Sequence, residues 1–318
     1  MLIFMVNRQE YDITMSITGK SILKTIVYYD CLDYPLTKEE LEFFSFKNEN
    51  GPAKDDLIES AGGFYFLKGR GKLLKIRKER NELAKNKWKK ALRAVRLLRF
   101  IPYIRLVFGS GSLVLGNTNK ESDLDFLIIA KHGRIWTARS LAVFLLNFLG
   151  LLRRRGQITA PDRVCLNHFI TDKSLHIPRK SIYTAQLYAR LAPVTRDEKL
   201  IDEFIKANSW ISNYIPGWPE CVKNQKANVI NYNSNIRSFL EKILDTKFGD
   251  WVEAVFRKYN LHRIKNYHLT YKSGGRVKAD DDSLEFHPDS PELIILEKYN
   301  QKMIGLGFED LTEDTSFD

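Results

Sequence analysis

The sequence predicts an α+β protein, in which a small mixed sheet with helices is flanked by further helical regions. Strand-like apolar segments alternate with a helix between residues 102 and 171, and nearly every segment from residue 181 onward has helical periodicity. The chain has 318 residues, of which 44% are hydrophobic and 28% are charged. It is therefore long enough to bury a sizeable core, and its composition excludes a wholly disordered or collagen-like chain.

The first 70 residues predict a small winged-helix-like module, residues 1–70. Thr37 is a suitable N-cap because Glu40 follows three residues later, which is the spacing of a capping box. We expect, in order, a helix at 21–32, a capped helix from Thr37, a short third helix at 55–60 and an aromatic strand at 64–67. The same pattern is also compatible with a plain helical cap on the next domain.

Charge is distributed unevenly along the chain, whose formal net charge is +11. Residues 68–99 carry a net charge of +12, and residues 279–318 carry −10. Apolar residues recur with helical spacing in the basic segment, so we expect a basic amphipathic connecting helix at residues 71–100. Its candidate nucleic-acid-binding cations are Lys85, Lys89, Arg93 and Arg96. The alternatives are a merely solvated helix face, or a face neutralised by the acidic C-terminal region.

The next region, residues 101–180, is expected to form the mixed core. Its strands are predicted at 105–108, 124–130 and 163–171, with one apolar helix at 134–152. Arg139 interrupts that helix, which favours a buried core helix over a membrane span. Residues 181–318 are expected to form a helical C-terminal domain with an acidic tail, with helices near 181–192, 197–212, 234–246, 250–268 and 290–304.

The most specific pattern of the sequence lies between the first two core strands. A strand runs into a Gly-Ser turn at Gly111 and Ser112, and Asp123 and Asp125 stand where the next apolar strand begins. Glycine lets backbone amides approach a phosphate closely, and a helix starting at Ser112 would add its unpaired N–H groups. Two carboxylates two residues apart on a strand share one face, where divalent cations relieve their repulsion. The spacing does not fit a dinucleotide-binding motif or a P-loop.

These residues resemble the signature of the polymerase-β-like nucleotidyltransferase superfamily, including its stand-alone bacterial members. The matching positions are Gly111, Ser112, Gly116, Ser122, Asp123 and Asp125. The resemblance implies a polymerase-β-like core and transfer of a nucleoside monophosphate from an NTP or dNTP to a hydroxyl, with release of pyrophosphate. It implies Mg²⁺ or Mn²⁺ as cofactor, held by Asp123 and Asp125. The implied nucleotide-binding residues are Gly111, Ser112, Gly116, Ser122 and Lys120.

Two residues compete for the position of a third metal ligand. The resemblance implies a carboxylate from a later strand, but the strand predicted at 163–171 contains no acidic residue. Asp162 precedes this strand and is slightly favoured as the third catalytic carboxylate, while Asn167 lies within it as a neutral oxygen ligand. His168 is a candidate for proton removal, although a lone histidine on a strand is more often structural. Lys120 and Arg139 are candidates for charge neutralisation.

The expected function is therefore a cytoplasmic metal-dependent nucleotidyltransferase. We favour a nucleic acid or oligonucleotide as acceptor, in untemplated addition or short-oligomer synthesis of the kind used in phage defence. The alternatives are nucleotidylation of a protein, tRNA or small molecule in a toxin–antitoxin module, and a catalytically degenerate regulator that binds nucleic acid or a partner protein. The three cysteines are far apart, and the apolar run at residues 2–6 is short, so the sequence predicts no disulfide framework, thiolate zinc site, signal peptide or membrane insertion.

Overall fold

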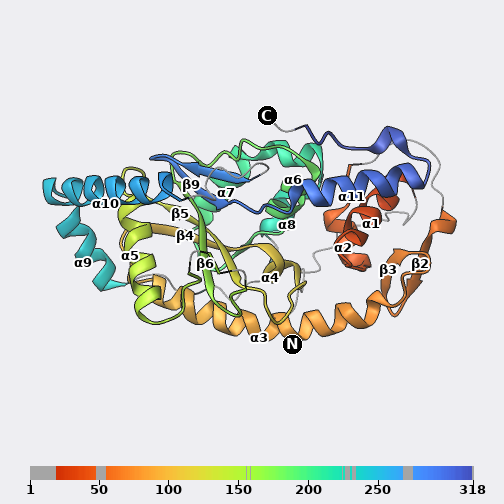
Figure 1. Ribbon diagram of the computed structural model, residues 1–318, viewed down its shortest axis with the longest axis horizontal. Helices are drawn as coiled ribbons and strands as arrows, with labels where there is room; N and C mark the ends of the chain where they lie inside the picture. The colour runs from red at the N-terminus through yellow and green to blue at the C-terminus, as the bar shows by residue number, and fades with distance from the viewer. Residues whose placement is uncertain are drawn as a thin grey trace.

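The computed structural model has an α+β fold, as the sequence predicts, with two sheets and helices around them. It describes residues 19–47, 55–154, 156–157, 159–223, 225, 230, 234–267 and 275–316. The smaller sheet lies in the N-terminal part, and the larger sheet lies in the middle of the molecule (Figure 1). The long helix α3 (Leu73–Leu98) runs along one side and joins the two parts (Figure 1).

The N-terminal part consists of two helices and a three-stranded antiparallel sheet with the order β1-β3-β2. Its elements are α1 (Lys20–Asp30), β1 (Leu36–Thr37), α2 (Lys38–Phe44), η1 (Asp55–Leu57), β2 (Ile58–Ala61) and β3 (Phe64–Leu67). The predicted capping box is confirmed, because Thr37 Oγ1 accepts from the Glu40 backbone N–H at 3.2 Å and Glu40 Oε2 accepts from the Thr37 N–H at 3.0 Å.

The prediction of a third helix at residues 55–60 is wrong. Only one 3₁₀ turn forms there, and the chain then enters β2, in which Ile58 pairs with Leu67 of β3. Gly62 and Gly63 both have positive φ, which closes the hairpin between these strands. The loop expected before this element falls on residues 48–54, which lie outside the described residues.

The larger sheet has six strands in the order β7-β4-β5-β6-β9-β8. The predicted core elements are present as β4 (Ile104–Gly109), α4 (Gly111–Leu115), β5 (Leu124–Ala130), α5 (Ile135–Phe148) and β6 (Val164–Thr171). Strand β5 is antiparallel to β4 and parallel to β6. Its residues 126–130 are buried, which explains why they form a continuous apolar run.

Three strands of this sheet come from the region that was expected to be helical. They are β7 (Ala192–Pro193), β8 (Arg276–Ala279) and β9 (Ser283–His287). Strand β9 is antiparallel to β6, with His168 opposite Glu285. The sheet therefore crosses the predicted domain boundary at residue 180, because the hairpin of β8 and β9 completes its edge.

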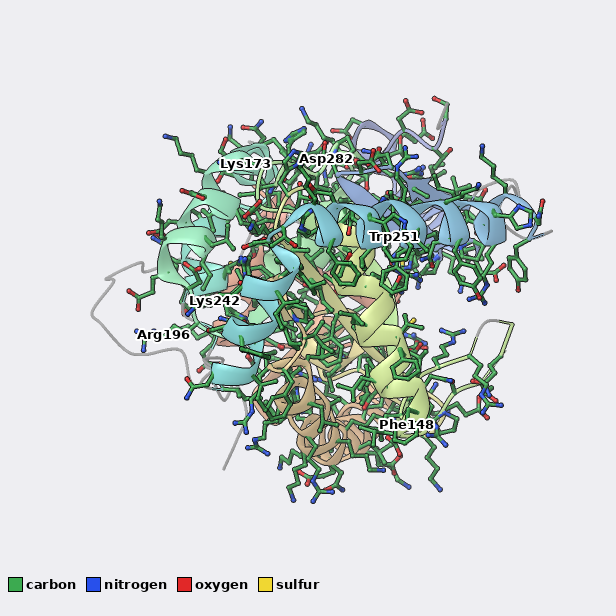
Figure 2. All side chains as sticks on the ribbon, turned by 90° about the vertical axis from the view of Figure 1, so that its left-hand side faces the viewer. Phe148, Lys173, Arg196, Lys242, Trp251 and Asp282 are labelled. Atoms are coloured by element: carbon green, nitrogen blue, oxygen red, sulfur yellow. The ribbon has the colours of Figure 1, made fainter. Side chains whose placement is uncertain are left out.

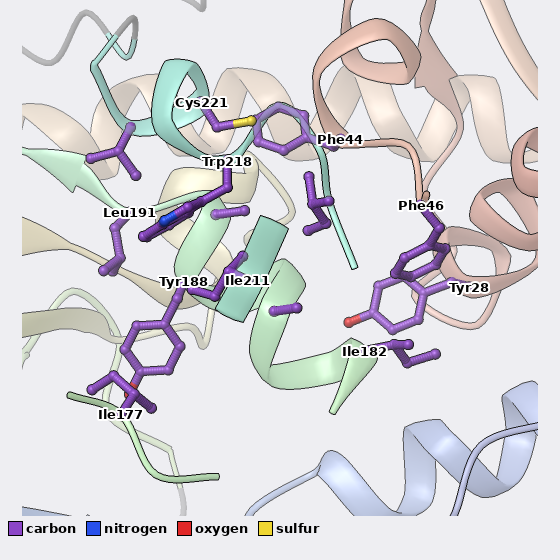
Figure 3. Packing of buried hydrophobic residues seen from close by; sticks show 14 of the residues in the cluster. Tyr28, Phe44, Phe46, Ile177, Ile182, Tyr188, Leu191, Ile211, Trp218 and Cys221 are labelled. Carbon is purple, nitrogen blue, oxygen red and sulfur yellow. The ribbon is translucent and has the colours of Figure 1, made fainter. Parts of the chain in front are cut away.

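The remaining C-terminal elements are helical, and several of them pack on the N-terminal part. They are α6 (Ile182–Ala189), α7 (Glu198–Ala207), η2 (Ser209–Asn213), α8 (Trp218–Lys223), α9 (Asn235–Leu244), α10 (Lys247–Lys265), α11 (Glu292–Gly305) and η3 (Glu309–Leu311). Figure 3 shows Tyr28 and Phe44 of the N-terminal part in one hydrophobic cluster with Ile182 and Trp218. One core thus continues from α1 to α11.

Helix α5 differs in one respect from the buried helix that was expected. Its side chains Ile135, Trp136 and Leu146 are buried, but Phe144 and Phe148 are 70% and 78% exposed. Helices α9 and α10 lie on the same face of the molecule and expose further apolar residues, among them Trp251 (Figure 2). Among the described residues, no helix is both long and apolar enough to cross a membrane.

Candidate functional site: a carboxylate pair beside a glycine turn

The Gly-Ser turn lies directly against the carboxylate of Asp125. Gly111 has φ of 64°, and a Cβ added to it would lie 2.8 Å from Asp125 Oδ2. The backbone N–H of Ser110 donates to the Asp125 carbonyl oxygen at 3.0 Å. The structure therefore brings together the turn and the strand start that the motif contains, and it leaves no room for a side chain at Gly111.

A third ligand-type side chain, Cys165, joins the two aspartates. One ligand atom each from Asp123, Asp125 and Cys165 lies within 4.8 Å of the other two. Cys165 arrives there because β6 is parallel to β5 with Cys165 paired to Asp125. The sequence did not single out this cysteine as a site residue. The available signal was its position two residues before Asn167, which places both on one face of the strand.

The charges of this cluster shift the pKa of its members. Burial and the nearby Asp123 carboxylate raise the pKa of Asp125 to about 7. Burial, with Asp125 and Asp123 next in order, raises the pKa of the Cys165 thiol well above its usual value. Without a cation the site thus favours a protonated Asp125 and a neutral thiol, and a bound cation would favour the ionised forms of both.

Asp162, the slightly favoured third carboxylate, does not face this cluster. Its two oxygens form ion pairs with Lys87, at 2.9 Å, and with Lys90 of α3. Asn167 does approach the cluster, since its Nδ2 donates to Asp125 Oδ1 at 3.3 Å. In this orientation it offers its nitrogen, so its predicted role as an oxygen ligand requires rotation of the amide.

An arginine that the sequence did not single out holds one of the two aspartates. Arg153 Nη1 lies 2.6 Å from Asp123 Oδ2 and 4.0 Å from Cys165 Sγ. Its other terminal nitrogen donates to the Gln157 carbonyl oxygen at 3.0 Å. The guanidinium group therefore neutralises the carboxylate that a cation would bind, and the two compete for Asp123 Oδ2.

Helix α3 contacts the loop between α4 and β5, and these contacts give structural roles to two motif residues, Gly116 and Ser122. A Cβ at Gly116 would lie 2.7 Å from Asn81 Oδ1, so glycine permits the contact between the loop and α3. Ser122 Oγ donates to Asn119 Oδ1 at 3.0 Å, and the Ser122 carbonyl oxygen accepts from Lys87 Nζ at 2.7 Å. Both residues shape the loop. The Lys120 side chain is exposed at its tip.

The cations of α3 divide into a structural and an exposed group. Arg77 and Lys87 are buried and paired with Glu40 and Asp162. Of the four cations predicted to bind nucleic acid, Lys89, Arg93 and Arg96 are exposed, while Lys85 is partly buried and pairs with Glu82 at 2.5 Å.

The described carboxylates of the acidic C-terminal region for which ion pairs are seen contact groups outside α3. Asp310 and Glu313 pair with Lys20 and Lys24 of α1, at 3.1 and 3.2 Å. Asp281 pairs with Arg257 of α10 at 2.6 Å. These carboxylates therefore neutralise other helices. Arg139 likewise lies elsewhere, with its guanidinium 4.7 Å from the centre of the Phe286 ring.

The donor set fits a divalent cation. Two carboxylates suit Mg²⁺ or Mn²⁺, and the neighbouring thiol adds a softer donor. Comparisons with protein-family models, with curated proteins and with solved structures found no match. The geometry of this site is therefore the basis for proposing a function.

Proposed function

We propose that the protein is a metal-dependent nucleotidyltransferase with a polymerase-β-like core. The observation that carries this proposal is the contact between the Gly111 turn and the Asp125 carboxylate, with Asp123 beside it. A glycine turn that admits a phosphate and a carboxylate pair that binds a cation are the two parts that nucleotidyl transfer requires. Nucleoside triphosphate is the donor, and a hydroxyl group is the acceptor.

The side chains of the site divide the work of this reaction. A divalent cation held by Asp123 and Asp125 would activate the acceptor hydroxyl and neutralise the triphosphate. Asp125 must lose its proton before it binds the cation. Arg153, once displaced from Asp123, is a charged donor suited to a phosphate oxygen. The backbone at Gly111 and Ser112 supplies N–H groups near the phosphates.

The exposed cations of α3 favour a nucleic acid or oligonucleotide as the acceptor. Lys89, Arg93 and Arg96 follow each other at spacings of four and three residues, so they share one side of the helix. Trp88 of the same helix packs on Gly109, the last residue of β4, next to the turn. A polyanion bound along α3 would thus pass close to the Gly-Ser turn. The three-stranded sheet of the N-terminal part, with the order β1-β3-β2, favours a winged-helix-like module before α3.

Replacement of both aspartates by alanine, Asp123→Ala/Asp125→Ala, is expected to abolish incorporation of labelled nucleotide. The purified protein is incubated with each α-labelled NTP and dNTP, with Mg²⁺ or Mn²⁺ and single-stranded oligonucleotides. Glu121→Gln, an exposed acidic residue of the same loop, is the matched control and should keep full activity. Incorporation that survives in the double variant would contradict the proposal.

A methyl group at the turn is expected to disturb the same site. Gly111→Ala places a Cβ 2.8 Å from Asp125 Oδ2, so it should lower the transfer rate at least tenfold as well as cost about 1–2 kcal/mol of stability. Gly133→Ala is the control, since Gly133 has a similar φ of 72° but nothing within 4 Å of the added Cβ. It should lose stability only. Equal rates for the two variants would contradict the placement of the turn in the site.

Removal of the exposed cations of α3 is expected to weaken the binding of nucleic acids to a similar extent whatever their nucleotide sequence. Lys89→Ala/Arg93→Ala/Arg96→Ala should reduce the slope of log K against log salt by about 2–3, because each phosphate contact contributes about 0.7–0.9. The control replaces three exposed lysines outside α3, namely Lys173, Lys206 and Lys242. Lys173 and Lys242 are labelled in Figure 2. An unchanged slope in the α3 variant would remove this helix from the acceptor site.

A second candidate function is a catalytically degenerate protein that binds nucleic acid or a partner. The ion pair between Arg153 and Asp123 and the lack of an acidic residue in β6 favour it. The two candidates differ in one outcome. A degenerate protein would bind oligonucleotide through α3 but incorporate no label with any nucleotide or metal. Incorporation into a protein or tRNA would instead indicate a different acceptor for the same chemistry.

A further inference from the structure

Strands β6 and β9 bring two histidines and a glutamate together outside the carboxylate pair. His168 of β6 is paired with Glu285 of β9, and His287 follows Glu285 by two residues on the same face of that strand. One ligand atom from each of these three side chains lies within 4.8 Å of the other two. The nucleotide site described above uses none of them.

A small cavity opens beside this cluster. Its volume is about 20 Å³, and its lining includes His168, Glu285 and Ser283 but not His287, which lies beside Glu285 in the cluster. That is room for one occupant of about the size of a water molecule. Glu285 Oε1 is buried and makes no hydrogen bond among the described residues, although Arg276 Nη2 lies 2.7 Å away as an ion-pair partner.

Each histidine is oriented through one ring nitrogen. Nδ1 of His168 lies 3.3 Å from the Tyr188 hydroxyl, and Nδ1 of His287 lies 3.2 Å from Asn167 Nδ2. Within the described residues, Nε2 of neither ring has a hydrogen-bond partner. Histidines that ligate metals are commonly held in this way, with one nitrogen fixed by a neighbour and the other available.

Burial favours the neutral form of both rings, which is the form that binds metal. Burial, and then the positive charge of Arg276, lowers the pKa of His168 to about 3. Burial, and then His168, lowers the pKa of His287 to about 4. Two neutral imidazoles with one carboxylate suit Zn²⁺ or Co²⁺ better than Mg²⁺, which prefers oxygen donors.

Two glutamates and two arginines lie together beside the cluster. Arg276 pairs with Glu285 at 2.7 Å and with Glu292 at 3.5 Å, and Arg179 also pairs with Glu292 at 2.7 Å, so Glu292 can keep its contact with Arg276 if Glu285 turns away. Lys278, which also lines the cavity, pairs with Asp280 at 3.2 Å. Glu285 can therefore turn toward a metal without leaving Arg276 unpaired.

We propose that His168, Glu285 and His287 form a second divalent-cation site, which takes a transition metal such as Zn²⁺ and ties β9 to β6. This site is separate from the proposed nucleotidyl transfer and does not depend on it. It lies next to the carboxylate pair, because Asn167 contacts both His287, at 3.2 Å, and Asp125, at 3.3 Å. A metal in it would hold the position of Asn167 and so support the first site.

The test is the binding of Zn²⁺ and Co²⁺ to the full chain. In Asp123→Ala/Asp125→Ala/Cys165→Ser, which removes the donors of the first site, one equivalent should still bind. Its Co²⁺ complex should show visible d–d bands without the charge-transfer band of a thiolate ligand. His168→Gln and His287→Gln should each lose this equivalent, and His132→Gln, an exposed histidine, should keep it.

Three results would overturn the proposal. They are the absence of bound Zn²⁺ in the wild-type chain, a thiolate band in the Co²⁺ spectrum of the triple variant, and retention of the equivalent in either His168→Gln or His287→Gln. Thermal unfolding provides a second measurement that does not need the triple variant. Zn²⁺ should raise the unfolding temperature of wild type more than that of His287→Gln, which keeps only the first site, and an equal rise in both would also overturn the proposal.

Discussion

Glu40→Ala is expected to lower the free energy of unfolding by about 3–5 kcal/mol, because it leaves buried cations without their partner. Glu40 Oε1 lies 3.0 Å from Arg77 Nη2 and 3.4 Å from Arg190 Nη1, and the side chains of both arginines are less than 5% exposed. The Tyr34 hydroxyl donates to the same oxygen at 2.5 Å. One carboxylate thus joins α2, α3 and the residue after α6, and denaturant unfolding followed by circular dichroism measures its loss.

The control for this prediction is Glu42→Ala in the same helix. Glu42 forms a surface pair with Lys38 at 3.8 Å, and such pairs contribute at most about 0.5 kcal/mol. Similar destabilisation by the two variants would contradict the central position of Glu40. A further check is Arg77→Met, which should cost less than Glu40→Ala because Glu40 keeps Arg190 as an ion-pair partner, whereas Glu40→Ala leaves two buried arginines without a carboxylate.

Asp125→Asn is expected to stabilise the metal-free protein at pH 8 by a few kcal/mol, while it abolishes activity. The pKa of Asp125 is raised to about 7, mainly by burial and then by Asp123, and every tenfold weakening of an acid corresponds to about 1.4 kcal/mol. The folded wild type therefore binds a proton that the unfolded chain has lost between about pH 4 and pH 7. Its stability falls as pH rises through this range, and that fall should be absent from the variant.

The measurement is urea unfolding from pH 4 to pH 8 with a chelator present. Asp162→Asn provides a control of opposite sign. Burial opposes ionisation of Asp162, but the ion pairs with Lys90 and Lys87 hold its pKa below the usual value. The ionised Asp162 carboxylate stabilises the folded protein at neutral pH and loses this effect in acid. Asp162→Asn should therefore lower the free energy of unfolding at pH 8. If Asp125→Asn followed the pH profile of wild type, the assignment of a raised pKa to Asp125 would be wrong.

The sequence predicted the elements whose signals are local. Thr37 and Glu40 form the expected capping box, and the strand predicted at 124–130 is observed with the same bounds. The motif also assigned the Gly-Ser turn and the two aspartates to one site, and the structure places Gly111 against Asp125. In each case the residues that interact are close in sequence, or their spacing is fixed by a turn.

Features that depend on distant partners were missed. The hairpin of β8 and β9 falls in a region predicted to be helical, and its pairing partner β6 lies more than 100 residues earlier. Alternation in residues 283–287 was the available signal. The sequence also could not show which cations of α3 are exposed and which are buried in ion pairs. Lys87 pairs with Asp162, which is 75 residues away in the chain, and Arg77 pairs with Glu40, which is 37 residues away. The identity of the third ligand-type side chain at the candidate metal site also depended on strand register, because the register places Cys165 rather than Asp162 beside Asp125.

The most direct test of the central claim follows the two ends of the triphosphate separately. With α-labelled nucleotide, the label should appear in the extended acceptor, and with γ-labelled nucleotide it should appear in pyrophosphate, at one pyrophosphate for each nucleotide added. Both signals should require Mg²⁺ or Mn²⁺ and should vanish in Asp123→Ala/Asp125→Ala. Release of γ-label as inorganic phosphate without transfer of the α-label, or no reaction with any nucleotide, would contradict the assignment of nucleotidyl transfer to this site.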